Sequence, residues 1–115
     1  MLPAGVYGLS NARLDTPWPK LQRARQALTD CLDAPDSECL LALLADPRPA
    51  ADTQLPQTGV GLATERLLSS VFIASAHYGT RASTALLVAA NGRRELRERS
   101  FGPAGAHLGE VRLRL

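Results

Sequence analysis

The sequence predicts an α+β domain in which a pair of helices packs against antiparallel strands. Apolar residues recur at helical spacing over residues 17–33, and a second apolar run at residues 37–45 ends at an Asp-Pro pair. The C-terminal third instead alternates around an Asn-Gly turn. Helices and strands do not alternate along the chain, which argues against a parallel sheet. A chain of 115 residues with 45% hydrophobic content suits one domain with one core.

The N-terminal region is expected to form a short strand followed by the first helix. Gly5–Leu9 carries Val and Tyr between glycines, a pattern typical of a strand. Asp15 or Thr16 is a suitable N-cap, which places Pro17 at the first helical position, where its missing N–H has no intrahelical partner. The expected apolar stripe of this helix comprises Leu21, Ala24, Leu28, Cys31 and Leu32. We expect the helix to end near residue 33.

A second helix is expected from Ser37 to Ala45, capped by Asp36 or Ser37 and ended by Asp46-Pro47. Its four leucines require burial on more than one side. Residues 46–59 contain three prolines and are typical of a flexible surface loop. A helical turn is expected over residues 64–70, and residues 71–73 are expected to be either a short strand or the extended end of that turn.

Asn91-Gly92 predicts a hairpin between strands 81–90 and 93–101, because a type I′ turn needs positive φ at both positions. This turn pairs residues whose numbers sum to 183, so it places Leu87 opposite Leu96. The first strand is apolar on both faces and is expected inside the sheet. The second strand is mostly charged and is expected near an edge or with one wet face. A last strand, at residues 110–115, alternates between charged and apolar residues.

Cys31 and Cys39 lack the spacing and the histidine neighbours of a metal site, and we expect both to be reduced, small apolar residues in the cytosol. His77 and His107 have no carboxylate or cysteine neighbours in the sequence, so neither is expected to bind a metal. No segment resembles a secretory signal or a membrane span. We therefore expect a cytoplasmic protein with no metal and no cofactor.

The formal net charge of +2 is too small to indicate a nucleic-acid-binding protein. The charge is unevenly placed: residues 1–80 carry six cations and eight acids, whereas residues 81–115 carry seven arginines and three glutamates. The basic part suits either an anionic small molecule or solvated strand faces. The excess of arginine over lysine is typical of a GC-rich bacterial genome.

Two short loops hold the candidate site residues. Ser10 and Asn11 follow the first expected strand, and the Asn11 amide can either donate to a developing oxyanion or bond its own turn. Tyr78, Thr80 and Arg81 precede the hairpin, where the arginine can either bind a carboxylate or phosphate or anchor the loop to a neighbouring carbonyl or to Asp15. Ser10 has no nearby base and no GxSxG motif, so a serine hydrolase is not expected.

Three blocks of the sequence occur in the order seen in a known family. They are GVYGLSNARLDTPWPKLQRARQAL, LPQTGVGLATERLLSSVFIAS and YGTRASTALLV, with RERSF after the turn. They resemble the NRDE protein family, also called the transport and Golgi organization protein 2 family. The resemblance implies an N-terminal-nucleophile-hydrolase-like αββα sandwich, in which two antiparallel sheets are stacked between helices. It corresponds to the family's C-terminal half, so residues 1–115 are expected to form a single partial domain.

Members of that family begin with Met-Cys and carry an Asn-Arg-Asp-Glu signature downstream, whereas this chain begins Met1-Leu2-Pro3. Cys31 and Cys39 cannot replace the family's first cysteine, because its expected chemistry uses a free α-amino group beside the thiol as the base. A truncated gene, a misassigned start codon and a cut fragment all fit this opening. Half of a two-sheet sandwich exposes apolar faces, so we expect self-association through exposed sheet edges.

The resemblance leads to two functional hypotheses. In the first, the parent protein is an amide or ester hydrolase, and this segment contributes Asn11 or Arg81 to substrate binding. In the second, the protein is a non-enzymatic binding or trafficking module for an anionic amphipathic ligand, such as a lipid, an acyl-CoA or haem. Under both hypotheses the expected partner is a small anionic molecule, and this chain holds no complete catalytic site.

Overall fold

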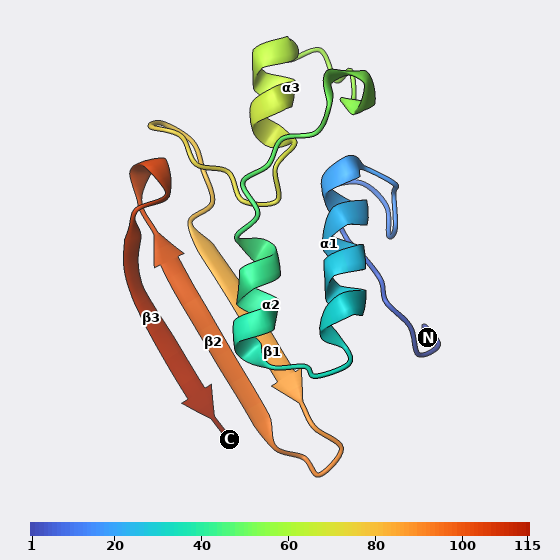
Figure 1. The fold of residues 1–115 in the computed structure, drawn as a ribbon, viewed down its shortest axis with the longest axis vertical. Coiled ribbons are helices and arrows are strands. Elements are labelled where there is room, and N and C mark those ends of the chain that lie inside the picture. Colours follow the sequence, from blue (N-terminus) through green and yellow to red (C-terminus); the bar gives the residue numbers. More distant parts are fainter.

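The computed structural model describes residues 1–115 and has the predicted α+β class (Figure 1). Three helices precede a three-stranded antiparallel sheet with the strand order β1-β2-β3. The elements are α1 (Pro19–Cys31), α2 (Ser37–Leu44), α3 (Leu62–Leu68), β1 (Ala82–Val88), β2 (Arg94–Phe101) and β3 (His107–Arg114). Short 3-10 turns lie at Asp52–Gln54 and Pro103–Gly105. None of the helices combines the length and the apolar character needed to cross a membrane.

The helices cover only one face of the sheet. α2 lies over β1 and β2, and α1 packs beside α2, while α3 lies beyond one end of the helix pair (Figure 1). On β1, Ser83 and Ala85 are buried beneath α2, whereas Leu86 and Val88 point the other way and are 59% and 66% exposed. The molecule therefore has two layers, and one apolar face of its sheet is uncovered.

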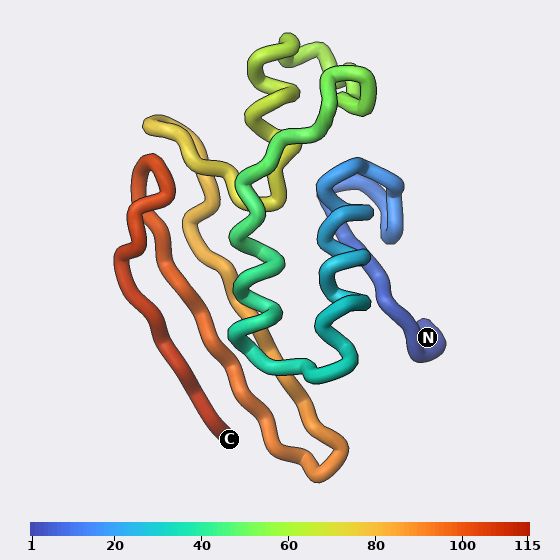
Figure 2. The backbone as a smooth tube through the Cα atoms, in the orientation of Figure 1, coloured from blue at the N-terminus to red at the C-terminus, as the bar shows by residue number.

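The hydrophobic core is small for a chain of this length. Leu41 of α2 is the one large side chain that is fully buried, and Phe72 packs edge-to-face on Phe101 with ring centroids 4.8 Å apart. The radius of gyration is 15.3 Å, whereas a compact domain of this length has a value of about 13 Å. The open sheet face and the protruding α3 region (Figure 2) account for this extended shape.

The first helix begins two residues later than predicted. α1 starts at Pro19, and Trp18 is its N-cap without a side-chain cap. The expected caps are used in the preceding turn, where the Asp15 carboxylate accepts a hydrogen bond from Gly8 N at 2.6 Å and Thr16 Oγ1 accepts one from Arg13 N at 3.1 Å. A proline still occupies the first helical position, as its fixed φ favours.

The short strand expected at residues 5–9 is absent, and of the two alternatives for residues 71–73 the strand is not formed. Residues 5–9 form no strand, and an isolated bridge between Leu9 and Leu14 takes its place. Residues 71–73 also form no strand, and Phe72 N donates instead to Asp46 O at 2.8 Å. The second helix is confirmed from Ser37 to Leu44, and the Asp36 carboxylate caps it by accepting a hydrogen bond from Cys39 N at 2.7 Å.

Cys31 and Cys39 form a disulfide, so the prediction of two reduced thiols is wrong. Cys31 ends α1 and Cys39 lies in the first turn of α2, with their Cα atoms 6.2 Å apart, within the usual range for a disulfide. The two helices were predicted, but not that the chain reverses direction between them and so brings the two cysteines together. Disulfides persist in oxidising environments, so the expected cytoplasmic location stays a prediction.

The hairpin exists as predicted, but its register differs by one residue. Leu86 pairs with Leu96, and Leu87 pairs with Glu95, so paired numbers sum to 182. The loop is longer than a two-residue type I′ turn, because Ala89 N donates to Arg93 O and Gly92 N donates to Ala89 O. Only Gly92 has positive φ there. This geometry fits a type I turn followed by a left-handed glycine, the common three-residue hairpin loop.

The prediction that the first hairpin strand lies inside the sheet is wrong, whereas the second strand, expected near an edge or with one wet face, is not at an edge but has one uncovered face. The apolar strand β1 lies at an edge, and the charged strand β2 lies in the centre. β2 tolerates that place because its charged side chains pair with those of β3 and α2, as described below. The last strand alternates as predicted, with Val111 and Leu113 on the uncovered face and Glu110 and Arg112 on the helix-covered face.

Candidate functional site

A cleft of about 410 Å³ lies between the N-terminal segment, α1 and the end of α2. Most of its wall is apolar, and its two charged side chains are both cations. The lining comprises Tyr7, Gly8, Leu9, Ser10, Asn11, Trp18, Lys20, Leu21, Ala24, Arg25, Leu28, Leu43, Leu44 and Val71. Its volume lies within the usual range for small-molecule sites, roughly 300–1,000 Å³.

The N-terminal turn forms one wall of this cleft. Gly8 N donates to the Asp15 carboxylate, and Asp15 N donates back to Gly8 O at 2.7 Å. Asp15 has the left-handed φ of 56° that this tight closure requires. Gly8 lies so close to α1 that an added Cβ would be 2.6 Å from Leu21 Cγ. A glycine therefore allows the segment to approach the helix, and the turn presents Ser10 and Asn11 at the cleft.

Arg25 lies in the cleft wall and has unused hydrogen-bonding capacity. Its Nη2 donates to Val6 O at 2.9 Å, and its Nε is 3.6 Å from the Asp15 carboxylate. That Nε is buried and donates no hydrogen bond. Because the Arg25 side chain makes one hydrogen bond within the chain and lines the cleft, the remaining N–H groups of its guanidinium that face the cleft can donate to an anionic acceptor there.

Lys20 is the second cation of the cleft. Its Nζ donates to Leu68 O at 2.9 Å, which holds the amine at the junction of α1 with the end of α3. Burial lowers the pKa of the Lys20 amine from its ordinary value. An ammonium has three donors, so two remain for other acceptors.

The structure brings part of the predicted site together. Ser10 and Asn11 line the cleft, and Asn11 also lines an adjoining cavity of about 200 Å³ together with Tyr78. Trp18 and Lys20 lie in the wall that the two cavities share. Ser10 Oγ accepts a hydrogen bond from Ala12 N at 3.2 Å, as in an ordinary turn, whereas the Asn11 side chain makes no hydrogen bond.

Thr80 and Arg81 lie outside both cavities. Thr80 closes its loop, because its N donates to Ile73 O at 2.8 Å and its Oγ1 accepts from Ile73 N at 3.0 Å. Arg81 is exposed, and its guanidinium forms no ion pair, so it does not anchor the loop to Asp15. Sequence reasoning missed Lys20 and Arg25, although both flank the apolar stripe of the first helix at Leu21 and Ala24.

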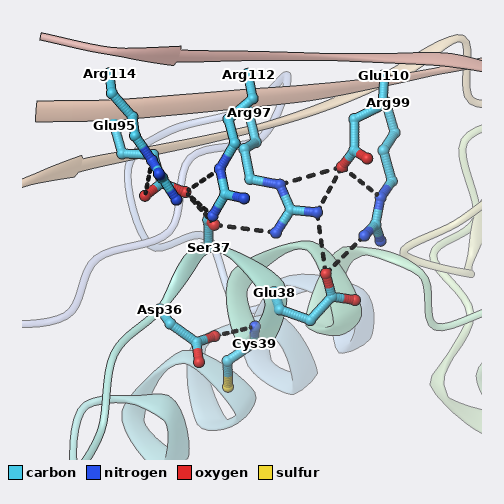
Figure 3. Close-up of polar contacts among 10 residues, drawn as sticks. All are labelled: Asp36, Ser37, Glu38, Cys39, Glu95, Arg97, Arg99, Glu110, Arg112 and Arg114. Atoms are coloured by element: carbon cyan, nitrogen blue, oxygen red, sulfur yellow. Dashed lines mark hydrogen bonds and ion pairs between the residues drawn. The ribbon is translucent and has the colours of Figure 1, made fainter.

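A second group of polar residues joins α2 to the sheet (Figure 3). We call it the polar cluster, and it comprises Ser37, Glu38, Glu95, Arg97, Arg99, Glu110, Arg112 and Arg114. Ser37 Oγ donates to Glu95, while Arg97 donates to Ser37 Oγ at 3.1 Å and to Glu110 at 2.6 Å. Glu38 of the same helical turn pairs with Arg97 at 3.1 Å and with Arg99 at 2.7 Å.

The four arginines and three glutamates of the polar cluster pair with one another, so the cluster acts as an attachment between layers. Every glutamate in it faces at least two arginine partners. The hydrogen bond from Ser37 is the main cause that lowers the pKa of Glu95, and the hydrogen bond from Arg97 is the main cause that lowers the pKa of Glu110. The cluster holds the start of α2, whose other end lines the cleft.

Acid is expected to weaken this attachment. The pKa values of Glu95 and Glu110 in the folded chain lie below their ordinary values, so their stabilisation is present above about pH 4.3 and is lost as the pH falls through the folded values. Urea unfolding followed by circular dichroism should give a midpoint that falls below that pH. The Glu95→Gln/Glu110→Gln variant should show a shallower fall, and equal pH profiles for the two proteins would contradict this role.

Comparison with known proteins agrees with the sequence blocks described above. The family model described as Transport and Golgi organisation 2 matches residues 1–103. The human Transport and Golgi organization protein 2 homolog is 36% identical over 111 residues, and the mouse Transport and Golgi organization 2 homolog is 33% identical over 111 residues. Each alignment covers 88% of this chain and 40% of the relative.

A bovine Transport and Golgi organization protein 2 homolog is 34% identical over 119 residues, with the same coverage. The chain thus spans about two fifths of the length of these relatives. All three are mammalian, so the bacterial source expected from composition stays a prediction. The family model and the relatives together show that the chain belongs to the Transport and Golgi organisation 2 family.

Proposed function

We propose that this chain binds an anionic amphipathic small molecule, such as a fatty-acyl carboxylate, in the cleft beside α1. The observation that carries the proposal is the composition of the wall, where nine of the fourteen lining residues are hydrophobic and the charged ones are Lys20 and Arg25. An acyl chain gains free energy when it leaves water for such a wall. Its carboxylate gains charge-assisted hydrogen bonds from the cations.

An acyl ligand suits the cleft better than haem does. Haem in proteins is held by a side-chain axial ligand, most often histidine, cysteine or methionine. His77 and His107 do not line the cleft, and both cysteines are in the disulfide. The adjoining cavity at Asn11 and Tyr78 offers room for a polar headgroup beyond the carboxylate.

The hydrolase hypothesis applies to the longer family protein and remains a proposal, as does the N-terminal-nucleophile-hydrolase-like sandwich. One observation favours a role for this segment in it: the Asn11 side chain is free of hydrogen bonds and lies at the cleft. We propose that Asn11, rather than Arg81, contacts a carbonyl oxygen there, as side-chain amides do in acyl transfer. The disulfide leaves this chain without a free thiol nucleophile.

A titration with dodecanoate, followed by calorimetry, tests the binding proposal. Arg25→Gln and Lys20→Gln are each expected to weaken dodecanoate binding about tenfold, the loss expected for one charge-assisted hydrogen bond of ~1.5 kcal/mol. Arg13→Gln is the matched control, since its side chain is exposed and outside the cleft wall.

Dodecanol, which lacks the charge, should bind the parent chain and both variants with the same weak affinity. Equal dodecanoate affinities for the parent chain, Arg25→Gln and Lys20→Gln would contradict the proposal. Thermal melts of each variant separate loss of the site from loss of the fold.

A further inference from the structure

The adjoining cavity of about 200 Å³ contains a buried carboxylate that has no cationic partner. Glu65 of α3 lines this cavity and is only 7% exposed. Its Oε1 accepts hydrogen bonds from Thr58 N at 2.8 Å and from Thr58 Oγ1 at 2.5 Å. These bonds lower the pKa of Glu65 below its ordinary value, so the group is ionised at neutral pH. The second carboxylate oxygen, Oε2, accepts no hydrogen bond from the chain.

The nearby cations do not neutralise Glu65. Arg66, the next residue, pairs with Asp52 at 2.6 Å. Lys20 lines the same cavity, but its Nζ donates to Leu68 O and forms no ion pair with Glu65. Buried carboxylates are normally paired with a cation or bound to a metal. No group of three acidic, histidine or cysteine side chains is placed to hold a metal ion, so this single carboxylate is suited to an organic cation.

We propose that the adjoining cavity binds an ammonium group and that the ligand of the cleft is a zwitterionic amphipath. Its ammonium would lie beside Glu65, its anionic group at Lys20 and its alkyl chain in the cleft. Asn11, Trp18 and Lys20 line both the cleft and the adjoining cavity, so one molecule can extend from one into the other. This inference rests on the proposed function, because the alkyl chain of the ligand occupies the cleft. We call the adjoining cavity the ammonium subsite.

The aromatic residues of the ammonium subsite favour a methylated ammonium. Trp18 and Tyr78 line it together with Glu65. Aromatic rings attract cations, and aromatic side chains are the usual means by which proteins recognise quaternary ammonium groups. A quaternary ammonium also has no N–H that the wall would have to pair. A second anion in this cavity would instead meet the charge of Glu65, and like charges in contact are costly.

The spacing of the two charged residues suits a compact head group. Glu65 precedes Leu68 by three residues of α3, which is about 4.5 Å along the helix axis. Since Leu68 O holds the Lys20 amine, the anion-binding and cation-binding side chains are fixed about one helical turn apart. The phosphate and the ammonium of a phosphocholine head are likewise separated by only a few bonds. Dodecylphosphocholine is therefore the probe that fits both charges and the cleft.

Calorimetry compares dodecylphosphocholine with dodecyl 3,3-dimethylbutyl phosphate, in which carbon replaces the ammonium nitrogen, both below the concentrations at which they form micelles. The parent chain should bind the ammonium ligand about tenfold more tightly, as expected for one largely desolvated cation contact. Glu65→Gln keeps the side-chain size and an oxygen acceptor for Thr58, and it should remove this preference. Glu98→Gln is the matched control, since Glu98 also accepts a threonine hydrogen bond, from Thr84 at 2.6 Å, but lines neither the cleft nor the subsite.

A dodecanoate titration separates the subsite from the fold and from the cleft. Glu65→Gln should bind dodecanoate at least as tightly as the parent chain, because it removes an anion near the carboxylate. Equal binding of the two phosphate ligands by the parent chain, or a preference that Glu65→Gln retains, would overturn the ammonium subsite and leave the proposed function intact. Equal weakening of all three ligands by Glu65→Gln would also overturn it, since Glu65 would then be structural. Failure of all three ligands to bind the parent chain would overturn both proposals.

Discussion

Replacing Leu41 with alanine is expected to lower the free energy of unfolding by about 3 kcal/mol, within the ~2–5 kcal/mol seen for buried leucines. Leu41 lies in the middle of α2, the helix that contacts α1 on one side and β1 and β2 on the other. It is the one large side chain that is fully buried. Its removal leaves a cavity at the junction of both layers, and few other core residues offset the loss.

Urea unfolding followed by circular dichroism measures this effect. Leu62→Ala is the control, because Leu62 is about half exposed at the start of α3 and its truncation should change stability by less than ~0.5 kcal/mol. A Leu41→Ala variant as stable as Leu62→Ala would show that α2 does not pack on the sheet as described.

Breaking the bond between Cys31 and Cys39 is expected to lower the free energy of unfolding by about 2–3 kcal/mol. The cysteines are eight residues apart, and the chain-entropy relation gives about 2.6 kcal/mol for a loop of that size. Cys31 is buried at the end of α1, so opening the bond also releases that helix end from α2. Urea unfolding of the parent chain is compared with and without a reductant. The difference in the free energy of unfolding then reports the disulfide alone, because no side chain is replaced.

The Cys31→Ala/Cys39→Ala variant is the control for this measurement. It should be as unstable as the reduced parent and should not respond to the reductant. Thiol titration of the unfolded, air-oxidised parent should find no free thiol. Two titratable thiols per chain, or equal stability of the parent with and without reductant, would contradict the disulfide.

The sequence predicts best those helices and strands that begin or end at a recognisable cap, proline or turn dipeptide. The Asp36 cap and the Asp46-Pro47 stop gave the second helix almost to the residue. Alternation gave the last strand, and Asn91-Gly92 gave the hairpin. The hairpin register was missed because that dipeptide suits both a two-residue and a three-residue loop, and the choice depends on the backbone of Asn91.

Placement within the sheet could not be inferred from the composition of each strand alone. β1 is apolar on both faces, although one of them is uncovered in this chain. β2 is charged yet central, because Glu95 is satisfied by Ser37 and Arg112, which come from different elements. Such partners are distant in sequence, and no local pattern in β2 identifies them.

The candidate site was predicted only in part, because some of its residues come together through contacts that are distant in sequence. Ser10 and Asn11 stand out as a turn after a short apolar segment, and they line the cleft. In the sequence, Arg25 resembles an ordinary solvated cation of a helix. In the structure the N-terminal segment folds back along the helix, and Arg25 Nη2 donates to Val6 O. The disulfide likewise depends on a chain reversal between two helices that the apolar periodicity alone does not reveal.

We propose that the cleft beside α1, rather than the exposed sheet face, receives an anionic amphipathic ligand. Two-dimensional NMR of the ¹⁵N-labelled chain, titrated with dodecanoate, tests it most directly. We predict that the amide shifts concentrate at residues 7–11 and 20–28. The amides of Leu86, Leu96 and Leu113 should keep their chemical shifts. Shifts confined to those three leucines and their strand neighbours, with residues 7–11 and 20–28 silent, would contradict the account.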